Sequence, residues 1–549
     1  MSFTLQYLGK TETFDKKVRL LDLLGERAND KEFVCARVNN RSRELTYEVY
    51  YDAKVEFLTC ADDTEAVKIY EASLRFVASM AFHRLYPDLK VRFCYNISRS
   101  IFIQLLDGKR ADLHMARAIQ EEMKKIIAED LPMTRYTVSK EEARQFYIEN
   151  NFDDKLEILD YRPEKTVHLY DCAGYKNYMY YRMVPSTGYL KDFAMRLYPP
   201  GIILQYPRVE SKGKIPPFED APTFGKTLKE SHEWSKIAGA DTVAGINAHI
   251  KKDGVIDFIQ LCEARHNRML TELGDLIERD ITDIRLICIA GPSSSGKTTF
   301  ANRLRIELLS RGIKPIRISI DDYYLPKNEV PLDDEGKPDL ESIEALDIDL
   351  FNKNMLDLIN GEEVQLPKFD FKSGKRVPGR VLKVGDDEPI IIEGIHALNE
   401  RLTNLIPKHQ KFKIFIAPQV QINLDNGTPL SLTDLRLIRR IVRDYKFRNA
   451  AADETLGMWS SVRRGEFTWI YDTQEGANYV YNSMLSYELS VMKKYAMPLL
   501  EAIDVDNQYY PTAERLIRML KYFVDMPDEW VPCNSLMREF IGGSCYADV

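Results

Sequence analysis

Hydrophobic and polar residues alternate with different periods in successive parts of the chain. Residues 1–60 contain short alternating stretches, FTLQYL, FVCARVN, LTYEVY and KVEFLT, which are typical of strands in a small β-rich module. Between residues 61 and 210, helical patterns such as EAVKIYEASLRFVASMAFHRLY are interspersed with strand patterns such as SIFIQLL. This mixture predicts an α+β domain for residues 61–210.

The second half of the chain has a more regular order of elements. Residues 210–230 are rich in Pro, Gly and Lys and lack periodicity, so we interpret residues 211–283 as a linker followed by connecting helices. Between residues 284 and 505, apolar strands and amphipathic helices alternate, which predicts an α/β domain with a mostly parallel sheet. Residues 506–549 are then a C-terminal extension, helical at first and irregular afterwards.

The composition narrows the class of protein. Of the 549 residues, 44% are hydrophobic and 29% are charged, and the formal net charge is −8, which argues against a general nucleic-acid binder. The eight cysteines contain no C-x-x-C pair, the N-terminal residues lack the apolar core of a signal peptide, and no stretch approaches the roughly 20 apolar residues of a membrane span. We therefore expect a cytoplasmic protein with no membrane partner.

One motif indicates the chemistry of residues 284–505. In LICIAGPSSSGKTTF, residues 286–300, an apolar strand enters a G-x-x-x-x-G-K-T loop and a helix follows. Small residues let successive backbone N–H groups turn toward phosphate oxygens, and the helix adds its positive end. Lys297 then reaches the β- and γ-phosphates during catalysis, and the Thr298 hydroxyl coordinates Mg²⁺. The residues expected to contact the nucleotide are Gly291, Pro292, Ser293, Ser294, Ser295, Gly296, Lys297, Thr298 and Thr299.

The nucleotide is expected to be ATP. The guanine-reading motif N-K-x-D is absent, since the nearest string, NKNM at residues 352–355, lacks the Asp.

Two apolar strands end in carboxylates. PIRISIDDYY leads into Asp321, and EPIIIEGIHALN leads into Glu393. Ligands of open α/β sheets bind beyond the carboxyl ends of the strands. A hydroxyl kinase needs one carboxylate to accept a proton and another near the metal, and we assign Asp321 to the first role and Glu393 to the second. The alternative is that Asp321 caps a turn and Glu393 ends a strand in solvent.

Basic residues follow one side of a helix in RLIRRIVRDYKFR, residues 436–448. At 100° per residue, Arg436, Arg439, Arg440 and Arg443 lie within roughly 100° of one another, and Asp444 is the only acid in the stretch. Such a cluster repels itself without an anion, so we expect this face to present guanidinium groups to phosphate. A solvated charged face is the alternative.

Taken together, residues 284–505 resemble the uridine kinase/phosphoribulokinase family of P-loop kinases, and uridine–cytidine kinases most of all. The resemblance rests on the P-loop, SIDDYY, ALDIDLF, LPKFDF, IIIEGIHALN and LRLIRRIVRD, in that order. It implies ATP and Mg²⁺ as cofactors, Asp321 as the base for a nucleoside 5′-hydroxyl, and, by analogy alone, a homo-oligomer. It also implies that substrate contacts come from Tyr324, Asp347, Phe369, Phe371, Arg440 and Arg443, with Arg448 in a mobile lid.

Three departures from that pattern concern the acceptor and the lid. Gly374 stands where these kinases carry a base-contacting His, Ala450 replaces a second lid arginine, and the lid region is longer than the family minimum. Arg463 or Arg464 is expected to supply the missing lid charge. The phosphoryl-transfer residues are present, and the pyrimidine-selecting pocket is altered.

The N-terminal half resembles the front end of threonyl-tRNA synthetases. Residues 1–60 are similar to a TGS domain, and residues 61–210 are similar to the editing domain, through AFHRLYPDLKV, EEMKKIIAEDLPMTRYTVSKEEA and MVPSTGYLKDF. The resemblance implies that the editing domain's polar pairs fall on Phe76 with Met80 and on Met179 with Met183, so hydrolytic activity should be lost. His83 and Cys172 lie off register and are interpreted as structural.

These expectations define an α/β P-loop kinase domain preceded by a TGS-like module and an editing-like α+β domain. The leading hypothesis is ATP-dependent phosphorylation of a small-molecule hydroxyl, namely a nucleoside 5′-hydroxyl. The alternatives are a kinase for another acceptor, such as a sugar phosphate, and a nucleotide-gated regulator bound to RNA or the ribosome. The basic residues of the N-terminal half are interleaved with acids and form no clear RNA-binding stripe, so RNA is not the favoured partner.

Overall fold

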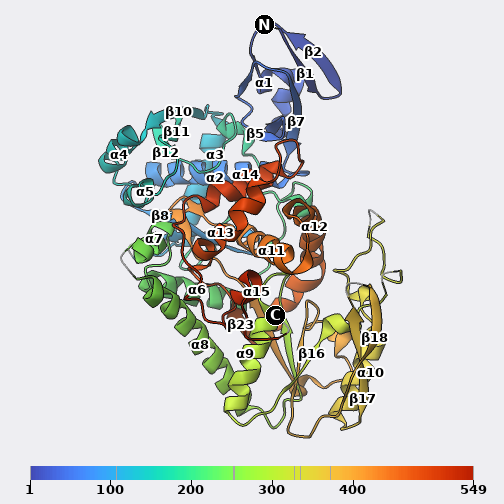
Figure 1. Cartoon of the computed structure of the whole chain (residues 1–549). Coiled ribbons are helices and arrows are strands. Elements are labelled where there is room, and N and C mark those ends of the chain that lie inside the picture. Colours follow the sequence, from blue (N-terminus) through green and yellow to red (C-terminus); the bar gives the residue numbers. More distant parts are fainter. Residues whose placement is uncertain are drawn as a thin grey trace.

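The computed structural model describes residues 2–106, 108–251, 254–326, 328–333, 336–370 and 373–547 (Figure 1). At the N-terminus, a mixed sheet has the strand order β2-β1-β7-β4-β5, and only its β1–β7 pair is parallel within the described residues. Alternate residues of β1 are buried, as the period of two predicts. The stretch LTYEVY contributes only the short strand β6. The elements are β1 (Phe3–Tyr7), β2 (Lys10–Phe14), β3 (Val18–Arg19), α1 (Leu20–Leu23), β4 (Phe33–Val38), β5 (Arg41–Arg43), β6 (Glu48–Val49) and β7 (Ala53–Thr59).

The next part of the chain is an α+β unit with two antiparallel sheets, one in the order β10-β11-β12 and one in the order β13-β14-β9-β8. Helix α2 begins at an N-cap, Asp63, whose carboxylate accepts a hydrogen bond from the Glu65 amide. The helices are α2 (Thr64–Leu85), α3 (Leu113–Ala128), α4 (Lys140–Glu149) and α5 (Asp153–Leu159). The strands are β8 (Val91–Ile97), β9 (Ser100–Leu105), β10 (Thr134–Ser139), β11 (Thr166–Cys172), β12 (Tyr175–Tyr178), β13 (Ala194–Tyr198) and β14 (Gly201–Gln205).

A parallel five-stranded sheet in the order β16-β19-β15-β20-β23 organises the C-terminal half, as predicted. Alternate residues of β15 enter different cores. Ile287 and Ile289 pack with helices α8 (Val255–Arg279), α9 (Lys297–Ser310) and α11 (Leu432–Arg448), whereas Leu286 and Cys288 pack on the side of α10 (Ile348–Ile359). Both faces are therefore covered, as an all-parallel sheet requires. The sheet strands are β15 (Leu286–Ala290), β16 (Ile316–Ser319), β19 (Ile390–Glu393), β20 (Lys411–Ala417) and β23 (Tyr479–Asn482).

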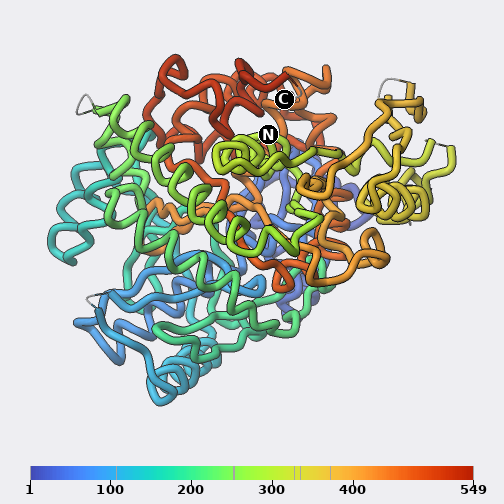
Figure 2. The backbone as a smooth tube through the Cα atoms, turned by 90° about the horizontal axis from the view of Figure 1, so that it is seen from below, coloured from blue at the N-terminus to red at the C-terminus, as the bar shows by residue number. Residues whose placement is uncertain are grey.

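Helices and two small hairpins complete this half. The β17–β18 hairpin and α10 form one edge of the molecule, in yellow in Figures 1 and 2. The helices are α9 (Lys297–Ser310), α10 (Ile348–Ile359), α11 (Leu432–Arg448), α12 (Ala452–Gly465), α13 (Glu488–Glu501), α14 (Tyr510–Leu520) and α15 (Arg538–Ile541). The hairpin strands are β17 (Val364–Asp370), β18 (Lys375–Leu382), β21 (Asn423–Asp425) and β22 (Thr428–Pro429).

The interpretation of residues 210–230 as a linker is wrong for their second half. Helix α6 (Pro222–Ile237) already begins at Pro222, and α7 (Val243–Lys251) and α8 (Val255–Arg279) follow. Apolar residues of α7 and α8, such as Ile246, Phe258 and Leu273, are buried in the same core as one face of the parallel sheet. Pro at the first position of a helix is favourable, so the Pro-rich composition marked a helix start as well as a loop.

The N-terminal half is docked on the C-terminal half through polar contacts. Asp434 of α11 forms ion pairs with Lys68 of α2 and with Arg515 of α14. The β21–β22 turn reaches β8, where the Phe93 amide donates to the Asn426 carbonyl at 2.8 Å. In the described part of the chain, no helix is both long and apolar enough to cross a membrane.

Candidate active site

The phosphate loop lies between β15 and α9 at the carboxyl end of the parallel sheet. A Cβ on Gly291 would lie 1.9 Å from the Ile416 carbonyl oxygen, so only glycine fits there. Gly296, with φ of +90°, adopts the left-handed conformation that turns the loop into the helix. The Lys297 ammonium donates to the carbonyls of Gly291 and Pro292 at 3.0 and 3.2 Å, which keeps it folded over the loop.

The two predicted carboxylates lie beside this loop. Asp321 follows β16 directly, in a short 3₁₀ turn, and Glu393 is the last residue of β19. Because β19 pairs with both β15 and β16, Glu393 is in register with Ile289 on one side and Ser319 on the other. The structure therefore brings the P-loop, Asp321 and Glu393 to one edge of the sheet.

The charges of Lys297, Asp321 and Glu393 affect one another's pKa values. Burial, followed by the charge of Asp321, raises the pKa of Glu393 to about 7. Asp321 retains access to solvent, yet protein atoms surround it closely enough that desolvation raises the pKa of its carboxyl group, against the opposing charge of Lys297. Burial also lowers the pKa of Lys297, and both carboxylates oppose that effect.

A divalent cation fits these oxygen ligands only together with a nucleotide. The Thr298 hydroxyl and the Glu393 carboxylate are the hard oxygen donors that Mg²⁺ prefers. Among the described residues, no group of three or more His, Cys, Asp or Glu side chains could hold a metal by itself. Mg²⁺ typically takes few protein ligands and completes its shell with phosphate and water, so this sparse set suits it.

The arginine-rich helix α11 is organised differently from the prediction. Arg436 and Arg439 do not present a basic face, because both are completely buried. Arg436 forms an ion pair with Glu466, and its Nη2 donates to the Ser293 carbonyl at 2.9 Å. The prediction failed because the carboxylates that pair with these arginines, Glu466 and Glu488, lie outside α11. A helical wheel of α11 alone does not include them.

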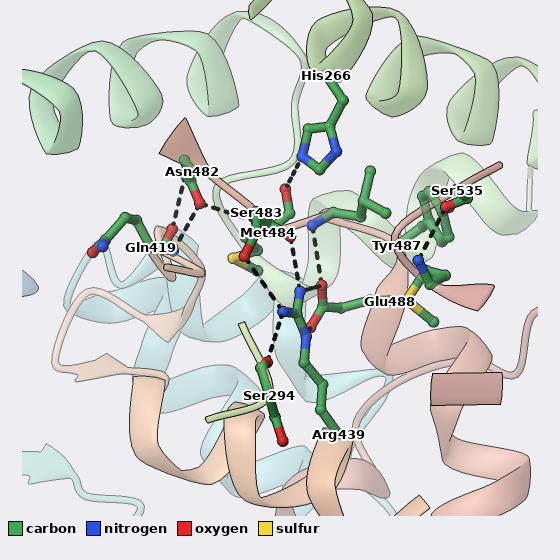
Figure 3. A network of polar contacts seen from close by, with 12 residues as sticks. His266, Ser294, Gln419, Arg439, Asn482, Ser483, Met484, Tyr487, Glu488 and Ser535 are labelled. Atoms are coloured by element: carbon green, nitrogen blue, oxygen red, sulfur yellow. Dashed lines mark hydrogen bonds and ion pairs between the residues drawn. The ribbon is translucent and has the colours of Figure 1, made fainter. Parts of the chain in front are cut away.

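Arg439 is the second of these buried arginines. Its Nε and Nη2 donate to the two oxygens of Glu488 at 2.9 and 2.6 Å, and its Nη1 donates to the Ser294 carbonyl at 3.2 Å (Figure 3). With Arg436, it fixes two consecutive carbonyls of the phosphate loop from behind. Both side chains therefore position the loop.

Three further arginines gather around one buried carboxylate. Asp444 forms ion pairs with Arg440 at 3.2 Å, Arg443 at 2.7 Å and Arg448 at 3.7 Å. Arg440 also donates to the Ser293 hydroxyl at 2.8 Å. Three guanidinium groups on one carboxylate leave an excess of positive charge beside the loop, which suits a phosphate ligand.

The two arginines expected in the lid are both paired. Arg463 donates to Glu466 at 2.5 Å and to the Tyr471 hydroxyl at 3.0 Å, so it joins the buried pair of Arg436. Arg464 forms an ion pair with Asp333 at 2.7 Å. In this conformation neither provides a free charge.

The expected acceptor contacts lie around the β17–β18 hairpin. The rings of Tyr324 and Phe369 are 5.8 Å apart, and both are mostly buried. Asp347 caps α10 by accepting from the Leu350 amide at 3.1 Å, and its other oxygen pairs with Arg376 at 2.7 Å. Phe371 lies outside the described residues.

Gly374 belongs to the same hairpin. It adopts a positive φ of 65° in the turn, and its amide donates to the Asp370 carbonyl at 2.8 Å. This conformation favours glycine, so the turn itself accounts for the residue that replaces the expected histidine.

Several residues near the site were missed from the sequence. Glu341 lies beneath α12, and burial raises its pKa to about 7 while Arg440 opposes the shift. His396 is almost completely buried against the edge of Trp469. Glu341 lies shortly before ALDIDLF and His396 lies within IIIEGIHALN, and this was the only available signal. The sequence offered no signal for Glu466 and Glu488, or for Glu539, which accepts a hydrogen bond from the Thr299 amide.

The editing-like unit has an apolar interior at the corresponding positions. Phe76, Met80, Met179 and Met183 are all buried in the core that joins the N-terminal sheets. Neither kind of side chain transfers protons; Phe has no metal-binding atom, and the Met thioether suits only soft ions such as Cu(I). Cys172 is buried in the same core, and the His83 ring lies 5.4 Å from that of Tyr175.

Comparison with known proteins agrees with this geometry. The model of the phosphoribulokinase/uridine kinase family matches residues 286–486. A uridine kinase of Staphylococcus aureus is 31% identical over 180 residues, which are 33% of this chain and 77% of that protein. The chain belongs to the phosphoribulokinase/uridine kinase family. A uridine kinase of Ureaplasma parvum is 29% identical over 177 residues, 32% of this chain and 77% of that protein. The C-terminal half is therefore a P-loop kinase domain.

The N-terminal half is similar to a different class of protein. A threonine–tRNA ligase of Rubrobacter xylanophilus is 31% identical over 167 residues, which are 30% of this chain and 26% of the ligase. The expected relationship to threonyl-tRNA synthetases is thus confirmed for that half, and it covers a quarter of the ligase only.

Proposed function

We propose that this protein is an ATP- and Mg²⁺-dependent kinase that transfers a phosphoryl group to the 5′-hydroxyl of a nucleoside. The observation that carries the proposal is the convergence of Asp321, Glu393 and the P-loop at one sheet edge. A hydroxyl kinase requires a phosphate cradle, a metal-side carboxylate and a proton acceptor in one place.

Each residue has a defined task in this scheme. The loop amides and Lys297 hold the β- and γ-phosphates of the donor. Thr298 and Glu393 would hold Mg²⁺, which supplies charge neutralisation between the phosphates. Asp321 accepts the proton of the attacking hydroxyl, and its raised pKa suits a group that must take up that proton.

The remaining residues orient the acceptor and the transferred group. Arg440, Arg443 and Arg448 neutralise charge as the phosphoryl group moves. Tyr324, Phe369 and Asp347 line the acceptor side. Arg376 supports Asp347 by holding one of its oxygens.

The test is an acceptor screen on the full chain with MgATP and ADP release as the readout. The arms are the common nucleosides, sugar phosphates and tRNA. ADP release stimulated by a nucleoside, with a nucleoside 5′-monophosphate as product, supports the proposal. Stimulation by sugar phosphates alone would show that the protein is a kinase but that its acceptor is not a nucleoside. Salt-sensitive tRNA binding without acceptor-stimulated turnover would replace the kinase with an RNA-bound switch.

A further inference from the structure

The C-terminal extension lies across the phosphate loop. After α14 the chain returns to the kinase sheet, where the short helix α15 lies next to α11 and near the start of α9 (Figure 1). From below, the red C-terminal residues lie beside the green helices of the kinase half (Figure 2). A Cβ on Gly296 would meet Leu536 Cδ2 at 3.0 Å, so this side chain rests directly on the loop.

A carboxylate of this extension occupies the anion-binding end of α9. The first hydrogen bond within α9 runs from the Phe300 amide to the Gly296 carbonyl, so the amides of Lys297, Thr298 and Thr299 point out of the helix end. The Thr299 amide donates to Glu539 Oε2 at 3.1 Å. An anion at this position gains from both the free amide and the helix dipole, as a nucleotide phosphate does.

The charge of Glu539 also reaches the rest of the site. It acts on the ammonium of Lys297, where it favours the protonated form, and on Glu393, whose pKa it helps to raise. Glu539 therefore lies among the groups that would hold the donor phosphates and the metal. A nucleotide phosphate and this carboxylate cannot both accept from the Thr299 amide, and their negative charges repel each other.

Contacts on two sides hold the extension in this position. The Ser535 hydroxyl donates to Glu263 of α8 at 2.5 Å, and Tyr487 donates to the same carboxylate at 2.7 Å. Phe540 is completely buried beneath the guanidinium of Arg439, 4.9 Å from ring centre to Cζ. Because Arg439 also holds the Ser294 carbonyl, the extension and the phosphate loop share one positioning residue.

We propose that residues 533–542 are an autoinhibitory segment in which Glu539 competes with a nucleotide phosphate for the Thr299 amide. The proposal rests on the nucleotide binding assigned to this loop above. Nucleotide then binds only when the segment moves away, and occupancy of the loop and docking of the segment weaken each other by the same factor. A ligand or partner that captures the free segment would activate the kinase.

The test measures MgADP affinity by titration calorimetry with the full chain and no acceptor. Glu539→Gln keeps the shape of the side chain and removes its charge, and we expect it to bind MgADP about tenfold more tightly than the wild-type chain. The control is Glu529→Gln, which neutralises an exposed carboxylate of the same extension and should leave the affinity unchanged. Hydrogen exchange of the wild-type chain gives a second measurement, because saturating MgADP should increase exchange across residues 533–542.

The outcomes separate this inference from the kinase proposal. Equal affinity of the wild-type and Glu539→Gln chains, with residues 533–542 equally protected at saturating MgADP, overturns autoinhibition and leaves the kinase intact. Absence of MgADP binding in every chain overturns the nucleotide site itself, and the autoinhibitory segment with it.

Discussion

Asp321 is the residue on which the proposed chemistry depends most directly. It lies in the 3₁₀ turn that follows β16, its carboxylate is close enough to interact with the charge of Lys297, and it retains access to solvent. Its assignment came from its place after an apolar strand, and the structure keeps it at the edge of the sheet that holds the P-loop.

Replacement of Asp321 separates catalysis from nucleotide binding. We expect Asp321→Asn to lower kcat about 10²–10⁴-fold, because the amide cannot accept the hydroxyl proton, while MgADP affinity changes little. Asp349→Asn, which alters an exposed carboxylate of α10, is the control for kcat. Turnover close to that of the wild-type chain would show that Asp321 is not the base.

His266 is a residue whose effect appears in stability as a function of pH. Its Nε2 lies 2.9 Å from the Met484 carbonyl, and burial lowers its pKa from 6.5 to about 3 (Figure 3). Between these values the unfolded chain binds a proton that the folded chain does not bind. The contribution of neutral His266 to the free energy of unfolding is therefore complete above pH 6.5 and decreases as the pH falls toward 3.

The corresponding variant is His266→Gln, which can still donate to the Met484 carbonyl but does not titrate. We expect its urea midpoint to fall less steeply than that of the wild-type chain between pH 6.5 and 4.5, even where it is less stable at pH 7. Parallel pH profiles of the two chains would rule out His266 as a source of acid sensitivity.

At the scale of elements, α11 contacts the phosphate loop through two buried arginines. Its two buried arginines each connect a distant carboxylate with one loop carbonyl. Removing one partner of a buried ion pair costs about 3–5 kcal/mol, whereas replacing both by apolar groups costs far less. This difference allows stability and positioning to be tested separately.

Glu488→Gln is the first variant for this test. We expect a loss of about 3–5 kcal/mol in the free energy of unfolding, because Arg439 keeps a buried and uncompensated charge. MgADP affinity should also decrease, since the Ser294 carbonyl loses a firmly held partner. Urea denaturation and MgADP titration measure the two effects.

The matched control is the double variant Arg439→Met with Glu488→Leu. It should recover most of the stability that Glu488→Gln loses, yet bind MgADP weakly because nothing holds the Ser294 carbonyl. Recovery of both quantities together would mean that α11 stabilises the domain without positioning the loop.

Elements formed by residues close together in the sequence could be predicted, whereas contacts between residues far apart in the sequence could not. The strand, loop and helix of the P-loop could be predicted because residues 286–310 carry their own periodicity and glycines. The parallel sheet followed from the alternation of strands and helices. The partners of Arg436 and Arg439 could not be predicted, since they lie 30 and 49 residues away along the chain. The Glu539 contact spans 240 residues and has no local signature.

At the scale of the whole molecule, a buried cluster of charges joins the two halves. Asp434 is 2% exposed, and it is the shared partner of Lys68 from the N-terminal half and Arg515 from the C-terminal half. Burial raises the pKa of this carboxyl group, but the charge of Arg515 and then that of Lys68 outweigh the effect, so the pKa is lowered overall. The carboxylate is therefore held ionised between two cations.

Asp434→Asn should weaken the contact between the two halves and so lower the stability of the whole chain. We expect about 3–5 kcal/mol of destabilisation, because the buried Arg515 and the partly buried Lys68 lose their shared counter-charge. The control is Glu56→Gln, which removes an exposed partner of Arg37 and should cost less than about 1 kcal/mol. Differential scanning calorimetry measures both, and equal effects in the two variants would contradict a role for Asp434 in docking.

The β21–β22 turn that pairs with β8 limits how this chain can be divided. A fragment that begins at residue 284 would lose α7 and α8, which fill one face of its own core, and would leave the Asn426 carbonyl without the Phe93 amide. A fragment that ends before residue 284 would leave the Phe93 amide without the Asn426 carbonyl. Although the two halves are similar to two different classes of protein, each has contacts that the other completes. We therefore expect each half to be recovered in folded form only when both are expressed together.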